Sequence, residues 1–173
     1  TLESLWQCQR PISAVEVIIV INSNPKTPGS IVQQNKKTQL ELTEWIIKHD
    51  TPEFRYFVIY RDDIEEKFAG AGSARKIGMD EAVYRFNQLG IENGIIVSLD
   101  ADVTLESNYL IEIEKAFFKK PQLNGLLIYF EHPASGSEFD HAVYEAITKY
   151  ELYLRYYKKS LDYCGFPYPF YTI

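Results

Sequence analysis

The sequence predicts an α/β protein built around a mainly parallel, twisted, doubly wound sheet flanked by helices. Two observations lead to this prediction. Short apolar runs rich in β-branched side chains are typical of strands that are buried on both faces of a parallel sheet. These runs alternate with longer segments whose apolar residues have helical spacing, which is the pattern of consecutive βαβ units. A single domain accommodates all 173 residues.

The first half of the chain supplies two of the predicted strands. Residues 15–21 are nearly continuous in Val and Ile and stop at Asn22, where the letters Asn-Ser-Asn-Pro predict a loop. Residues 31–49 have helical apolar spacing and predict the first helix. Residues 54–60 predict the second strand, which ends at Arg61.

The second half repeats the alternation. Gly90 lies just past a helical segment, at a position where glycine is favoured, and Pro121 stops a later one. The predicted helices are residues 74–89, 109–119 and 140–160, and the predicted strands are residues 94–99 and 125–130.

Charge and composition exclude several classes of protein. The net charge of −6 disfavours nucleic-acid binding, because Lys and Arg must neutralise the phosphates. The only cysteines, Cys8 and Cys164, make no disulfide framework and suit a reducing compartment. No apolar run is long enough to cross a bilayer. We therefore expect a cytoplasmic protein, and peripheral association with a membrane stays open.

Polar clusters follow three of the predicted strands directly. In parallel α/β sheets, ligands gather at the carboxyl ends of the strands, so these clusters are expected to meet in one crevice. They are Asn22-Ser23, Arg61-Asp62-Asp63 and Asp100-Ala101-Asp102.

Asp100 and Asp102 are the candidate metal ligands. Two carboxylates separated by one residue at a strand end suit Mg²⁺ or Mn²⁺, which prefer oxygen ligands and complete their shell with water and phosphate. The alternative interpretation is a solvated turn, in which Asp is also favoured.

Arg75 and Lys76 follow Gly70-Ala71-Gly72-Ser73 and open the predicted helix. A glycine-containing turn before a helix start suits an anion, since free backbone N–H groups and the helix dipole both favour negative charge. The alternative is an exposed basic pair. Neither a dinucleotide fingerprint nor a phosphate-binding GK[ST] motif is present.

Four of these segments together resemble the family 2 glycosyltransferases, which are inverting enzymes with the Rossmann-like GT-A fold. The resemblance covers about residues 15–104 in order and spacing. It rests on Val17-Ile18-Ile19-Val20-Ile21-Asn22, Tyr60-Arg61-Asp62-Asp63, Ala74-Arg75-Lys76-Ile77-Gly78, and Ser98-Leu99-Asp100-Ala101-Asp102, which is similar to the family's DxD motif.

The resemblance implies a role for each segment. Asn22, Ser23 and either Asp62 or Asp63 would contact the base and ribose of a nucleotide-diphosphate sugar, with Arg75 and Lys76 near the nucleotide. Asp100 would face the ribose or sugar, and Asp102 would bind the Mg²⁺ or Mn²⁺ that bridges the phosphates. Residues 15–105 would form the donor-binding core and residues 106–173 the start of the acceptor half. The acceptor, a glycan, a lipid or a protein, is not identified.

The chain also departs from the family pattern. The loop after the first strand carries Ser23-Asn24-Pro25-Lys26 in place of the usual Pro and Tyr, and Lys76 replaces an Asn. No segment after Asp140 matches the acidic stretch that supplies the family's catalytic base. Because the chain also starts without Met and ends on an apolar run, we expect a fragment of a longer protein, with a fold that is incomplete at its C-terminus and without its base.

Three other classes remain as alternatives. Residues 95–104 also resemble the Asp-x-Asp-x-Thr motif of haloacid-dehalogenase-like phosphohydrolases, in which Asp100 would be the nucleophile and Asp102 the acid/base. That motif usually ends the first strand, whereas here two βα units precede it. An EF-hand loop is disfavoured because Leu105 and Ile111 stand where Gly and Glu are required. A non-catalytic domain that binds a nucleotide or a partner on the same fold is the third.

Overall fold

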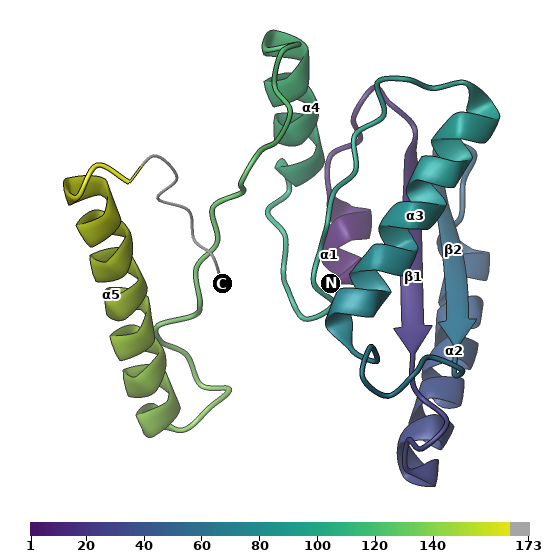
Figure 1. The fold of residues 1–173 in the computed structure, drawn as a ribbon, viewed down its shortest axis with the longest axis horizontal. Helices are drawn as coiled ribbons and strands as arrows, with labels where there is room; N and C mark the ends of the chain where they lie inside the picture. Colours follow the sequence, from purple (N-terminus) through teal and green to yellow (C-terminus); the bar gives the residue numbers. More distant parts are fainter. Residues whose placement is uncertain (167–173) are drawn as a thin grey trace. The chain divides into compact units, whose positions relative to one another are not determined.

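The computed structural model describes residues 1–166 and confirms an α/β protein (Figure 1). The chain divides into two compact units, Thr1–Gln122 and Leu123–Ile173, which are described separately below. Its elements are α1 (Leu2–Gln7), β1 (Val15–Asn22), α2 (Gly29–His49), β2 (Phe54–Arg61), α3 (Ala71–Leu89), α4 (Tyr109–Lys119) and α5 (His141–Tyr163).

Strands β1 and β2 form a two-stranded parallel sheet, as their apolar runs predict. The register pairs Val15 with Phe54 at one end and Asn22 with Arg61 at the other. Both strands therefore end at the same edge, and the loops that follow them begin side by side.

Helices cover both faces of this sheet, with α3 on one face and α2 on the other (Figure 1). On the α3 face, the Arg85 guanidinium pairs with Glu16 at 2.6 Å and lies 3.8 Å from the ring centroid of Phe57. The same helix packs against β1 at Gly78, where a Cβ would lie 3.5 Å from Val20, an ordinary van der Waals contact. Helix α3 starts at the edge where both strands end and runs back toward their amino ends (Figure 1), where Arg85 meets Glu16.

The opposite face carries the hydrophobic core of the first unit. Leu5 of α1 packs with Phe54 and Tyr56 of β2, and Trp45 and Ile46 of α2 close the cluster. Phe54 is 1% exposed, and burying such a side chain contributes about 1.5–3 kcal/mol. Helix α1 was not predicted, although Thr1 stands at its N-cap position, where Thr is favoured.

The prediction of a third strand at residues 94–99 is wrong. The described chain forms no strand there, and its backbone makes no ladder with β1. Ile96 and Val97 stay 40% and 38% exposed, whereas Leu99 packs against the core. An apolar run can therefore be anchored at one end without being paired along its length. A Cβ at Gly94 would lie 2.3 Å from the Phe86 ring, so a larger residue there would require this ring to move.

The second unit consists of an irregular segment and α5. Residues 125–130, predicted as a strand, form none among the described residues. Polar pairs connect this segment to the helix: Arg155 donates to the Tyr129 hydroxyl at 3.0 Å, and His132 Nδ1 lies 2.7 Å from Glu151. Among residues 1–166, this segment has α5 beside it but no strand with which to share backbone hydrogen bonds.

The predicted helices are present with small shifts in their ends. The helix over residues 109–119 is found as Tyr109–Lys119, and α5 extends to Tyr163. Gly90 ends α3 in the left-handed conformation, with φ of 66°, where a glycine avoids the strain of a side chain. Within residues 1–166, no helix combines the length and apolar character needed to cross a membrane.

Candidate functional site

The candidate site begins where β1 and β2 end. The Ser23 N–H donates to the Arg61 carbonyl at 2.8 Å, and the Ile64 N–H donates back to the Ser23 carbonyl at 3.3 Å. The Asn22 amide donates to the Gly70 carbonyl at 2.9 Å. The end of β1 is therefore fastened both to the loop after β2 and to the residue that precedes α3.

Ser23 is the most enclosed polar residue at this edge. It is 7% exposed, and its hydroxyl makes no hydrogen bond with any residue that the structure describes. Burying a hydroxyl without a partner is unfavourable, so Ser23 is a polar group that the described chain leaves unsatisfied at this edge.

The two acids after β2 differ in their surroundings. Asp63 accepts two hydrogen bonds from Arg61, at 2.7 and 3.1 Å. These bonds hold the pKa of the Asp63 carboxyl below its ordinary value and raise that of the Arg61 guanidinium. Asp62 is exposed beside this pair. Asp62 is therefore the more available carboxylate for an external ligand.

The start of α3 corrects the sequence prediction. The helix begins at Ala71, so Gly72 and Ser73 lie in its first turn and not in a loop before it. Arg75 is consequently inside the helix, and the first helical hydrogen bond runs from the Ala74 N–H to the Gly70 carbonyl at 3.1 Å. The free N–H groups belong to the three residues before Ala74, and no side chain caps them.

Arg75 and Lys76 point to different partners. Arg75 forms an ion pair with Asp100, which joins α3 to the turn that follows residue 99. The Asp100 carboxylate raises the pKa of the Arg75 guanidinium. Lys76 instead pairs with Asp80, one turn further along its own helix. The structure thus brings Arg75 to the candidate metal turn and leaves Lys76 on the helix surface.

The two candidate metal ligands are both on the surface of this turn. Asp100 has one oxygen on Arg75, and Asp102 is exposed. Among residues 1–166 there is no group of three or more His, Cys, Asp and Glu side chains that could hold a metal ion alone. This set does not fit an ion that requires a full protein shell. It does fit Mg²⁺ or Mn²⁺ bound by one or two carboxylates, with phosphate oxygens and water as the other ligands.

An open hollow lies between the loops after the two strands. It is lined by Asn24, Pro25, Lys26, Glu65, Glu66 and Lys67. Lys26 and Glu66 bridge it with an ion pair of 2.7 Å. The residues directly before these stand out in the sequence but the hollow does not, because its charged groups come from two loops that only the strand register brings together.

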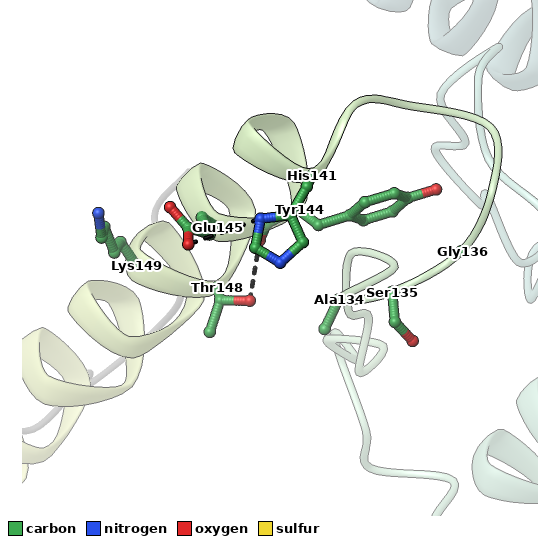
Figure 2. Close-up of a pocket in the computed structure, with 8 residues that line it drawn as sticks. All are labelled: Ala134, Ser135, Gly136, His141, Tyr144, Glu145, Thr148 and Lys149. Carbon is green, nitrogen blue, oxygen red and sulfur yellow. Dashed lines mark hydrogen bonds and ion pairs between the residues drawn. The ribbon is translucent and has the colours of Figure 1, made fainter.

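A second hollow belongs to the other unit and lies at the start of α5 (Figure 2). The Tyr144 hydroxyl there accepts hydrogen bonds from the backbone N–H groups of Glu138 and Phe139, at 3.2 and 3.3 Å. His141 Nδ1 lies 3.6 Å from Glu145. None of the predicted site residues lines this hollow, and its tyrosine is already engaged by the loop.

No protein-family model, curated protein or solved structure matches the chain. Its function is therefore argued from the geometry above together with the resemblance of its motifs.

Proposed function

We propose that this chain is the donor-binding part of a glycosyltransferase similar to family 2, with a GT-A fold, and that it binds a nucleotide-diphosphate sugar. The observation that carries the proposal is the ion pair between Arg75 and Asp100. It joins the start of α3, with its free N–H groups, to the turn that contains both candidate metal ligands. A guanidinium, a helix start and two carboxylates suited to a divalent cation are the groups that recognise a diphosphate.

Each site residue has a distinct part in this proposal. Asp102 is the principal ligand of Mg²⁺ or Mn²⁺, because Asp100 already shares one oxygen with Arg75. Asp100 orients Arg75 toward the phosphates and faces the ribose or sugar. Lys76 contributes positive charge from the helix surface.

The loops after the two strands form the nucleoside end of the site. Asn22 and Ser23 are held there by their hydrogen bonds to Gly70 and Arg61. Asp62 is exposed and has the acceptor oxygens that ribose hydroxyls require, whereas Asp63 is engaged by Arg61. Asp62 is therefore our choice between the two acids.

A bound divalent cation would offset the charge that develops on the leaving diphosphate. Direct displacement with inversion also requires a base within hydrogen-bond reach of the acceptor hydroxyl, about 2.6–3.2 Å away. The carboxylates assigned above all serve the donor. We therefore propose that residues 106–173 begin the acceptor half, and that the chain as given binds its donor without completing transfer.

The same geometry disfavours the phosphohydrolase alternative. In such an enzyme Asp100 would act as a nucleophile, but its carboxylate is paired with Arg75.

Free Cys8 and Cys164 support a reducing compartment, and we propose the cytoplasm as the site of the reaction.

Calorimetry with UDP and GDP, each with and without Mn²⁺, tests the proposal. We expect metal-dependent binding that Asp102→Asn reduces at least tenfold, by analogy with the loss of other metal-site interactions, about 10–100-fold. Asp162→Asn is the matched control, because Asp162 is also exposed but lies on α5. Metal-dependent affinity that Asp102→Asn leaves unchanged would disprove the metal assignment.

A further inference from the structure

The N-cap residue of helix α1, Thr1, contacts the turn that contains Asp102. The Thr1 hydroxyl lies 2.8 Å from the Ala101 carbonyl oxygen and 2.7 Å from that of Val103, and donates its proton to one of them. The same hydroxyl accepts a hydrogen bond of 3.0 Å from the Val103 N–H. Both backbone neighbours of Asp102 thus lie within hydrogen-bond distance of a single side chain.

The contact continues along the chain in the same direction. The Ser4 hydroxyl accepts from the Leu105 N–H at 3.2 Å, and the Cys8 thiol lies 3.4 Å from the Glu106 carbonyl oxygen. Just past the helix, the Gln9 N–H donates to the Ser107 carbonyl at 2.7 Å. Residues 1–9 therefore run beside residues 101–107 and bond to them at four places.

Apolar packing anchors the same helix to the sheet. Leu5 is 4% exposed and packs against Phe54 and Tyr56, and Leu99 and Leu105 pack against this cluster from either side of the turn. A helix so anchored is a rigid support, and a site built on rigid elements is placed more accurately than one on a free loop.

We propose that Thr1 and Ser4 are positioning residues: they fix the backbone of the turn over residues 101–105 and thereby set where Asp102 presents its carboxylate. The functional consequence of this positioning rests on the proposed binding of a metal and a nucleoside diphosphate at Asp102. Arg75 fixes the other side of the turn through Asp100, and Thr1 and Ser4 fix the side that follows. Partners that orient a metal ligand typically change metal affinity about 10–100-fold when removed.

The test compares Mn²⁺-dependent binding of UDP and GDP by calorimetry in the full chain and its variants. The double variant Thr1→Val with Ser4→Ala removes both hydroxyls and nearly preserves their volume. We expect a roughly tenfold loss of Mn²⁺-dependent affinity, with metal-free nucleotide binding unchanged. Thr1→Ser keeps the hydroxyl and should bind as the wild type does.

Thr43→Val is the matched control, because the Thr43 hydroxyl donates to the Gln39 carbonyl of its own helix, at 2.9 Å. The double variant and this control should melt at similar temperatures. Equal Mn²⁺-dependent affinity in the double variant and the wild type would overturn the positioning role. So would an equal loss in Thr1→Ser and Thr1→Val, since the hydroxyl would then be irrelevant.

Hydrogen exchange separates this inference from the proposed function. The Val103 and Leu105 amides, which donate to the two hydroxyls, should exchange faster in the double variant whether or not any nucleotide binds. Faster exchange in a protein without Mn²⁺-dependent binding would support the positioning role of Thr1 and Ser4 and overturn the proposed function. Unchanged exchange at both amides would overturn the positioning role itself.

Discussion

The two units of the chain contain similar apolar runs but use them differently. In the first unit, β1 and β2 pair along their full length, and Phe54 and Tyr56 are almost completely buried. In the second, residues 126–130 have an apolar sequence of the same kind, yet their side chains are between 41% and 61% exposed.

The difference lies in the neighbours and not in the runs themselves. β1 has a strand at its side and helices on both faces. Residues 125–130 contact α5 through polar pairs such as Tyr129 with Arg155, which leave backbone N–H and C=O groups without a ladder. An apolar run therefore predicts an extended segment that requires cover, and a strand forms only where a second extended segment meets it.

The largest expected effect comes from the core of the first unit. Phe54→Ala should lower the free energy of unfolding by about 3–5 kcal/mol, because it leaves a cavity beneath Leu5 and Trp45. Leu127→Ala in the second unit should change it by less than about 0.5 kcal/mol, since that side chain is 61% exposed. Urea denaturation followed by circular dichroism measures both. Similar losses in the two variants would mean that Leu127 is buried in solution.

A smaller effect on the free energy of unfolding is expected when either of two glutamates, one from each unit, is replaced by Gln. Glu114 is 8% exposed and accepts hydrogen bonds from the Ser13 and Ile12 N–H groups at 2.7 and 3.0 Å. Glu151 is paired with His132 and Arg155, whose side chains are 42% and 49% exposed. Glu114→Gln should cost about 1–2 kcal/mol at neutral pH, and Glu151→Gln less than about 1 kcal/mol.

The pH dependence of these costs has a defined sign. Hydrogen bonds from Ser13 and Ile12 lower the pKa of Glu114, and the hydrogen bond from His132 lowers that of Glu151. A lowered pKa in the folded state contributes stability above the ordinary carboxyl pKa, and this contribution is lost as the pH falls through the lowered value. Urea titrations of each variant at several pH values should therefore converge with the wild type in acid. A cost of Glu114→Gln that is constant down to low pH would contradict this explanation.

Much of the fold was predictable because its signals are local. The runs that became β1 and β2 are rich in Val and Ile, and Gly90 marked the end of α3. The strands predicted at residues 94–99 and 125–130 failed because pairing depends on distant partners that a local run does not specify. Helix α1 was missed because its six residues are too few to show helical spacing.

The candidate site was predictable in its residue types more than in its contacts. Asp100 and Arg75 stood out separately in the sequence, but their ion pair depends on α3 crossing the sheet. The contacts of the Thr1 hydroxyl with the turn around Asp102 join residues about a hundred positions apart, and only the fold reveals them. Because α3 starts at Ala71, earlier than predicted, its free N–H groups belong to Ala71, Gly72 and Ser73, and Arg75 lies further inside the helix.

The most direct test of the donor site is paramagnetic broadening of amide resonances by Mn²⁺ in the presence of UDP or GDP. If the metal and diphosphate bind as proposed, broadening should concentrate at residues 100–103, 70–76 and 22–23, and should weaken in Asp102→Asn. Broadening centred on residues 123–166, or an equal pattern in wild type and Asp102→Asn, would contradict the assignment of the donor site to the carboxyl ends of β1 and β2.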